Sequence, residues 1–166
     1  MPRSSKIINQ FDNSTLVAKD GTAVTPLSVS ILFVQGDISI TGLSNELADV
    51  SVYQTRRQVH SLRKGARTFP TISFSAMVSE FTEDDTGTLF DLITAKAGTP
   101  FEDRVSTTAA TGDVLTLDLE FTMDGETTVF EDCHIMFDVS EGDPNSASFS
   151  ATCYGAITGA LAIAGS

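Results

Sequence analysis

Tryptophan, cysteine and histidine are scarce in this chain, and their scarcity limits the chemistry that it can support. The 166 residues include no Trp, two Cys and two His. Cys133 and Cys153 form no C-x-x-C motif, and His60 and His134 lack the further ligands of a zinc site, so we expect no metal and no cofactor. In a reducing cytosol we expect two free, buried thiols; a disulfide between two strands is the alternative.

Motifs of catalysis are absent as well. The chain contains no G-x-S-x-G, H-E-x-x-H, G-x-x-x-x-G-K or Rossmann glycine pattern. Asp118 and Glu120 are spaced like two carboxylates on one strand face, but their neighbours Thr116 and Thr122 are polar and indicate a hydrated surface. The acidic run at 83–85 lacks the alternating ligands of a calcium loop. We therefore expect that the protein is not an enzyme.

Long apolar segments are also missing. No run approaches the ~18 residues that a membrane span requires, and residues 1–15 contain no apolar segment typical of a secretory signal peptide. Because 41% of the residues are hydrophobic and 19% are charged, we expect one folded domain over residues 1–166. We expect it to be made in the cytoplasm of the producing cell.

Positive charge is limited and unevenly distributed. Residues 1–79 carry eight basic and five acidic side chains, whereas residues 80–143 carry two basic and 17 acidic ones. Half of all Lys and Arg lie within "TRRQVHSLRKGARTFP" at 55–70. A chain with one basic and one acidic portion can attract further copies of itself if folding places the two on different faces. For the acidic portion, the alternative is a solvated surface that keeps the protein soluble.

What the sequence does contain is alternation of apolar and polar residues, which is typical of β-strands. The alternation is clearest in "DVLTLDLEFTMDG" at 113–125, where the polar face consists of Thr, Asp and Glu. Asp124 and Gly125 then predict a tight hairpin turn. The predicted strands lie within residues 28–43, 48–56, 69–81, 113–125, 126–139 and 147–163.

One segment shows helical spacing. Leu89 and Leu92 belong to an i, i+3, i+4 pattern that predicts a helix over about 84–97, with Asp84 or Asp85 as its N-terminal cap. One helix among six or seven strands predicts a mainly β fold, a sandwich or barrel with the helix packed against it.

The first 26 residues contain the turn signals "DNST", "KDGT" and "TPLS". We interpret residues 1–26 as an N-terminal arm with one short strand near 14–18.

In the order and character of these segments, residues 27–160 resemble the phage tail tube proteins, also called major tail proteins, whose fold relatives include the type VI secretion tube proteins. A long loop-like segment at 44–68 precedes the strand "FPTISFSAMVSEFT" and the acidic start of the helix, "DDTGTLFDLI". The long hairpin "GDVLTLDLEFTMDGETTVFEDCHIMFDV" and the terminal strand "EGDPNSASFSATCYGAI" follow. The family has no short diagnostic motif, so the resemblance depends on the ordered set.

The resemblance implies a β sandwich whose copies form six-fold rings, and rings that stack into a hollow tube. Double-stranded DNA leaves the capsid through such a tube without specific binding. The protein would be a structural component of the virion tail, made and assembled in the cytoplasm of the host bacterium. Its partners would be further copies of itself and the tape-measure, tail-tip and tail-terminator proteins.

In such proteins a long loop between early strands reaches a neighbouring subunit or ring, and residues 44–68 match this loop by position. The resemblance therefore implies that the loop contacts another copy. The contact residues that we expect are Tyr53, Arg56, Arg57, Arg63, Lys64 and Arg67, and the acidic counterparts that we expect are Glu80, Glu83, Asp84 and Asp85.

The polar faces of the predicted strands are suited to line the channel of such a tube. A duplex carries about one phosphate charge per 1.7 Å of its axis, so a basic wall would bind it, whereas a wall of Ser, Thr and acidic residues would not. For each such residue, the alternative is a solvated outer sheet face. The lumen-lining candidates are Thr71, Ser73, Ser75, Thr116, Asp118, Glu120, Thr122, Ser148, Ser150 and Thr152.

Three other functions compete with this interpretation. A nucleic-acid-binding module would use the basic cluster, but only Tyr53 and Phe69 flank it, and single-strand binding requires interleaved aromatic residues. A ligand-binding β barrel is disfavoured because Trp is absent and Tyr occurs twice. A tail terminator, head–tail connector, decoration protein or secretion-system tube has a related fold and ring symmetry. A tube protein should polymerise, whereas a terminator should stop at one ring.

Overall fold

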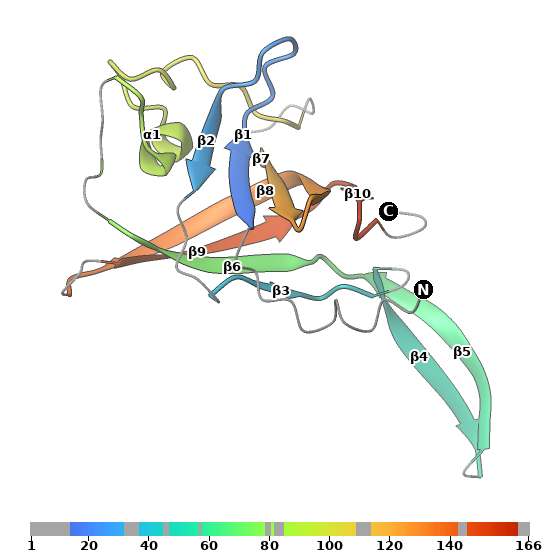
Figure 1. Ribbon diagram of the computed structural model, residues 1–166. Helices are drawn as coiled ribbons and strands as arrows, with labels where there is room; N and C mark the ends of the chain where they lie inside the picture. The colour runs from blue at the N-terminus through green and yellow to red at the C-terminus, as the bar shows by residue number, and fades with distance from the viewer. Residues whose placement is uncertain are drawn as a thin grey trace.

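The computed structural model describes residues 14–31, 37–44, 47–56, 58–78, 81, 85–108, 114–142 and 146–162. In these ranges the chain forms ten strands and one short helix, so the prediction of a mainly β fold with a single helix is confirmed (Figure 1). No helix in this part of the chain has the length and apolarity needed to cross a membrane. The elements are β1 (Thr15–Lys19), β2 (Ser28–Ile31), β3 (Ser39–Thr41), β4 (Ala48–Thr55), β5 (Gln58–Arg67), β6 (Thr71–Met77), α1 (Leu89–Thr94), β7 (Leu117–Met123), β8 (Glu126–Ser140), β9 (Ser146–Cys153) and β10 (Ile157–Gly159).

One antiparallel sheet contains eight of these strands. Their order is β2-β1-β7-β8-β9-β6-β3, and β10 also pairs with β8. In Figure 1, β2 and β1 run crosswise to β6, β8 and β9, and α1 lies beside β2. The sheet does not close into a barrel, which removes the barrel from the predicted alternatives. The remaining strands, β4 and β5, form a separate two-stranded sheet.

The long strand β8 connects two parts of the main sheet, one with β7 and β1 and the other with β9 and β6, and it carries a bulge between them. Its first half pairs with β7 and β10, and its second half pairs with β9. Between Phe130 and Cys133 it carries one residue more than β7 carries between Leu119 and Leu117. Asp132, within this bulge, adopts a φ of 54°. Since a bulge bends a strand and increases its twist, it turns β7 and β1 across the layer formed by β8, β9 and β6.

The core lies on the apolar side of the alternating strands, as the sequence predicts. Leu117 and Leu119 of β7 are almost completely buried. Phe74 of β6 stacks on Phe149 of β9 with ring centroids 5.0 Å apart. Burial of a side chain of this size contributes about 1.5–3 kcal/mol to the free energy of unfolding.

The two cysteines meet inside this core. Cys133 of β8 lies directly opposite Cys153 of β9, and both are buried and free, so the expected free thiols are confirmed. A hydrogen bond between the two thiols, together with burial, raises the pKa of Cys133.

The helix α1 is shorter than the predicted helix over 84–97. The Thr88 hydroxyl accepts a hydrogen bond from the backbone N–H of Asp91 at 3.3 Å, and the N–H of Thr88 donates to the Asp91 carboxylate at 2.8 Å. This capping box begins the helix directly after Gly87, whose φ is 72°. The prediction of an acidic cap is wrong, because Asp85 lies in the turn before Gly87.

The described part of the predicted N-terminal arm is not peripheral. The strand expected near 14–18 is present as β1, but it lies inside the sheet, between β2 and β7. Leu16 and Ala18 are completely buried, so this segment is part of the core. Residues 1–13 lie outside the described ranges.

Asp20, directly after β1, connects this strand to the segment before β7. Burial raises the pKa of its carboxyl group, but hydrogen bonds from four donors outweigh burial and hold the pKa below its usual value. The donors are Thr22 N, Thr22 Oγ1, Leu27 N and Val105 N.

Candidate assembly surfaces

The segment predicted as a long loop, 44–68, is mostly a β-hairpin. β4 and β5 pair with each other and project away from the main sheet (Figure 1). Every residue of β4 after Ala48 is exposed. A two-stranded hairpin has only marginal stability in water unless another layer packs on it. Of the described elements, the hairpin is therefore the one with the least support from the rest of the chain.

One face of the hairpin is apolar and uncovered. Val52 lies directly opposite Leu62, and Val59 lies opposite Gln54, two residues further along β4. Opposed residues of antiparallel strands lie on the same face of the sheet. We call the resulting row the apolar stripe; it consists of Val50, Val52, Val59 and Leu62, which are 63%, 50%, 60% and 64% exposed.

Sequence reasoning found only the first half of this stripe. The alternation at 48–56 predicts a strand, but the register shifts between Tyr53 and Gln54, where β5 carries an extra residue between Val59 and Ser61. This shift interrupts the period of two in β5. Val59 and Leu62 are nevertheless apolar residues in an otherwise polar segment, and this is the sequence feature that could have indicated the second half of the stripe.

The predicted contact residues lie on both faces of the hairpin. The Arg63 guanidinium lies 5.2 Å from the ring centroid of Tyr53, on the face opposite the apolar stripe, which is a cation–π geometry. Lys64 lies on the same face as the stripe, and Arg56 is exposed in the turn between the strands. Arg57 lies outside the described residues. The hairpin is therefore apolar on one face and basic around its perimeter.

Arg67 has a different place from the other predicted contact residues, because it bonds within its own chain. Its Nη2 donates to the carbonyl oxygens of Tyr154 at 3.3 Å and Gly155 at 3.5 Å. Its guanidinium lies 5.2 Å from the Phe69 ring, which is 4.9 Å from the Tyr154 ring. The backbone N–H of Thr68, directly after Arg67, donates a hydrogen bond to the carbonyl oxygen of Leu47 at 2.8 Å. Leu47 is 3% exposed. These contacts attach the base of the hairpin to the turn between β9 and β10.

A second candidate surface is the polar side of β6 and β9. The register places Thr71 opposite Thr152. At the next two positions of this face, a serine of β6 again lies opposite a serine of β9. Six of the ten predicted lumen residues are thereby brought together on one face, behind which lie Phe74 and Phe149 of the core. We call this the hydroxyl face; it consists of Thr71, Ser73, Ser75, Ser148, Ser150 and Thr152.

The other four predicted lumen residues lie on β7 or next to it, beyond the bulge of β8. Thr116 does not face solvent, as a lumen residue must: it is 6% exposed, and its hydroxyl lies 2.7–2.9 Å from the hydroxyls of three residues in the segment 106–108. Glu120 forms an ion pair with Lys19. The hydroxyl of Thr122 lies 2.9 Å from that of Thr127.

Asp118, the remaining one, accepts a hydrogen bond from the N–H of Asp132 at 3.0 Å. Burial raises its pKa. Sequence reasoning missed this burial, because the polar neighbours Thr116 and Thr122 suggest a hydrated surface.

The sheet region that carries the hydroxyl face ends in two strand edges. In the described part of the chain, β8 beyond Cys133 pairs with β9 alone, and β3 pairs with β6 alone. Unpaired N–H and C=O groups at such edges are a template for pairing with another chain. The two edges lie at opposite sides of the unit β3-β6-β9-β8.

Of the predicted acidic counterparts, the structure describes Asp85, which is exposed in the turn before α1. Glu80, Glu83 and Asp84 lie outside the described residues.

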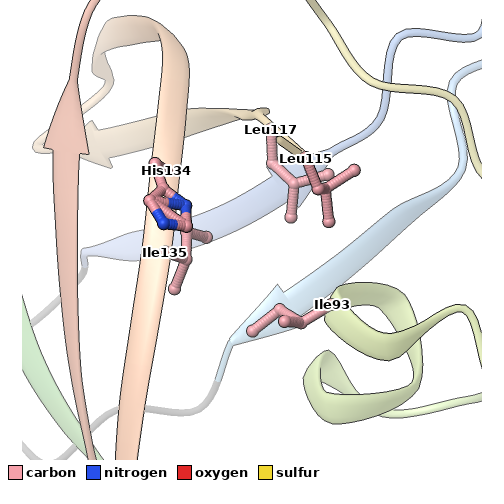
Figure 2. Close-up of a pocket in the computed structure, with 5 residues that line it drawn as sticks. All are labelled: Ile93, Leu115, Leu117, His134 and Ile135. Carbon is pink, nitrogen blue, oxygen red and sulfur yellow. The ribbon is translucent and has the colours of Figure 1, made fainter. Parts of the chain in front are cut away.

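A small cavity between α1 and β8 offers little room for a ligand (Figure 2). Its volume is about 150 Å³, below the ~300–1,000 Å³ typical of ligand sites. Nδ1 of His134 is buried and has no hydrogen-bond partner in the described structure. The size of the cavity does not favour a ligand-binding function. Its lining residues are Ile93, Leu115, Leu117, His134 and Ile135.

Metal-binding side chains do not converge in the described ranges: no group of three His, Cys, Asp or Glu residues there could hold a metal ion. The side chain of His60 lies outside the described part of the structure.

Solved structures with a similar fold come from contractile injection systems. One is a chain of the sheath/tube terminator of the extracellular contractile injection system PVC in the extended state, with a TM-score of 0.51 and 12% identity over 86% of this chain and 91% of that chain. Another is a chain of the PVC sheath-tube complex in the extended state, with a TM-score of 0.50 and 11% identity over 95% of this chain and 97% of that chain. No protein-family model and no curated protein matches the sequence. The similarity is one of fold over nearly the whole length of each chain.

Proposed function

We propose that this protein is a structural subunit that assembles with further copies of itself into stacked rings, which form the hollow tube of a phage tail or a related injection particle. The projecting hairpin carries the proposal. Its apolar stripe is half or more exposed, although full burial of each such side chain is worth about 1.5–3 kcal/mol. Covering the stripe with another subunit would stabilise both the hairpin and the assembly.

The edges of the main sheet support a ring. Pairing of the β3 edge of one copy with the free half of β8 of the next copy is a head-to-tail contact, which generates a closed ring when the rotation between copies closes. Two strands of this unit, β6 and β9, also carry the hydroxyl face, and β8 adds Met136 and Asp138 opposite Ser150 and Ser148. A ring built in this way has a polar surface, mostly of hydroxyls, on one side.

The chemistry of the hydroxyl face suits the inner wall of a tube. Its Ser and Thr hydroxyls are neutral, and they do not attract the dense phosphate charge of a duplex as Lys and Arg would. Under this proposal double-stranded DNA passes through the tube without specific binding. The likeness in fold to chains of a sheath-tube complex and a sheath/tube terminator supports a tail component.

The proposal has consequences for partners, location and chemistry. The tube subunit would also contact tape-measure, tail-tip and tail-terminator proteins, would be assembled in the host cytoplasm, and would end in the virion tail. It would act without catalysis and without a cofactor.

Negative-stain electron microscopy of the purified protein at low and at high salt tests the proposal. Hollow tubes at low salt support it, and their loss at high salt would implicate the basic perimeter of the hairpin, since salt screens exposed charges. Rings that never stack would instead favour a terminator or connector, which one of the similar structures makes the second candidate. A monodisperse monomer under every condition would overturn the proposal.

A further inference from the structure

An apolar patch is exposed where the core ends beside α1. Phe81 is 51% exposed, and Val139 of β8 is 44% exposed. The Phe81 ring lies 5.2 Å from the Phe90 ring, which lies 5.0 Å from the Phe137 ring. The Thr88 hydroxyl donates to the carbonyl of Phe81 at 2.7 Å and holds it beside the helix start. We call Phe81, Phe90, Phe137 and Val139 the phenylalanine patch.

Two described acidic residues lie next to this patch along the chain. Asp85, between Phe81 and α1, and Glu141, directly after β8, are exposed. The patch is therefore apolar at its centre, and Asp85 and Glu141 form an acidic rim beside it.

The hairpin has the complementary composition. Lys64 shares the face of the apolar stripe, and Arg56 lies in the turn at its end; both are exposed. In Figure 1 the hairpin projects from one end of the molecule, whereas α1, the end of β8 and the start of β9 lie at the other end. The two surfaces therefore cannot meet within one chain, but they can meet between two chains arranged head to tail.

We infer that the occupant of the phenylalanine patch is the hairpin of a second copy, whose apolar stripe packs on Phe81 and Val139 while its cations meet the acidic rim. This inference depends on the proposed self-assembly and adds the surface that receives the hairpin. Apolar contact supplies most of the affinity, and the opposite charges select the orientation and accelerate association.

Cross-linking between two differently tagged versions of the full chain tests this contact. One version carries Gln54→Cys, at an exposed polar position on the same face as the apolar stripe, and the other carries Ser140→Cys, directly after Val139. A short bismaleimide joins them after assembly. Cys133 and Cys153 are buried, so the parent chain provides a low background. The matched control replaces Ser140→Cys with Val24→Cys, which lies in the loop between β1 and β2 and is 92% exposed.

A band containing both tags is expected for the 54–140 combination and not for the 54–24 combination. If the variants assemble like the parent and the 54–140 combination gives no more product than the control, the inference fails while the proposed function stands. If the parent chain does not assemble at all, both fail together.

A charge introduced into the patch provides a second test. Val139→Lys places a cation opposite the cations of the hairpin, and it should raise the protein concentration required for assembly roughly tenfold. Val24→Lys should leave that concentration unchanged. Far-UV circular dichroism verifies that both variants are folded. Equal effects of the two lysines would overturn the inference.

Discussion

The main sheet and the hairpin β4–β5 are built from the same local pattern but end in opposite environments. In the main sheet, the apolar residues of the alternation are buried, as Leu119 and Phe130 show with 0% exposure. In the hairpin, Val52 and Leu62 also face each other across two antiparallel strands, yet they are 50% and 64% exposed.

The difference is in what covers each face. The apolar face of the main sheet is closed by the strands that cross it after the bend in β8 and by α1, whereas the hairpin projects beyond every other element (Figure 1). An apolar face that its own chain leaves uncovered is typical of an interaction site, and the proposed assembly would cover it. Substitutions at single positions can separate the residues that stabilise the folded chain from those that serve the proposed assembly.

The largest loss of stability is expected for Phe74→Ala. Phe74 is 2% exposed and stacks on Phe149, so truncation should lower the free energy of unfolding by about 3–5 kcal/mol. Urea unfolding followed by circular dichroism measures the loss. A loss below about 1 kcal/mol would mean that this side of the sheet is not the core.

The next largest loss of stability is expected for Asp20→Ala. The free energy of unfolding at pH 7 should fall by about 2–3 kcal/mol, because the backbone N–H groups of Leu27 and Val105 lose their acceptor. The folded-state pKa of Asp20 lies below its unfolded value, so the carboxylate stabilises the fold above the unfolded pKa, and this stabilisation is lost as pH falls through the folded pKa. The difference between parent and variant should therefore narrow below about pH 4. Urea unfolding at a series of pH values measures it.

Asp118 is the control for this prediction, because burial raises its folded-state pKa. Its ionisation costs stability as pH rises from the unfolded pKa through the folded pKa. Asp118→Asn keeps an oxygen acceptor for the N–H of Asp132 and should not destabilise the protein at pH 7. As pH falls, the parent should therefore gain stability relative to Asp118→Asn, whereas it should lose stability relative to Asp20→Ala. A parent that loses stability relative to both variants at low pH would contradict the assignment.

Arg67→Ala should have a smaller effect on stability, about 1 kcal/mol, because it removes hydrogen bonds to carbonyls at the protein surface. Its main effect should be on the hairpin, which loses an attachment to the turn between β9 and β10. Amide hydrogen exchange in β4 and β5 should accelerate, while exchange in β6 and β9 should not. Arg63→Ala, which removes only the contact with Tyr53, should not reproduce this pattern.

The smallest effect on subunit stability is expected for Leu62→Ser. Because Leu62 is 64% exposed, the free energy of unfolding of the monomer should change by no more than about 0.5 kcal/mol. Assembly should nevertheless be lost, which sedimentation and electron microscopy measure. Val24→Ser, at an exposed site outside the hairpin, should assemble like the parent, and tubes of normal yield from Leu62→Ser would show that the stripe is not a contact.

The features predictable from the sequence are those set by neighbouring residues. The hairpin turn at Asp124 and Gly125 is present, with φ values of 52° and 80° as a tight turn requires. The hydroxyl pairs of β6 and β9 follow from two alternating segments. The helix start was missed because Gly87 and the capping box of Thr88 outweigh the acidic residues before them.

The sequence by itself determined the strands with a regular alternation, which of their faces are apolar and where charge of each sign gathers, because alternation along a strand and turn formation depend on a few consecutive residues. It did not predict β5, whose period of two is interrupted by the register shift. Only the tertiary structure decided that β1 lies inside the sheet, that Thr116 is buried, that Arg67 bonds to its own chain and that the apolar stripe is uncovered. The physical reason is that burial depends on which distant segments pack on a face, and the bulge of β8 arranges these segments.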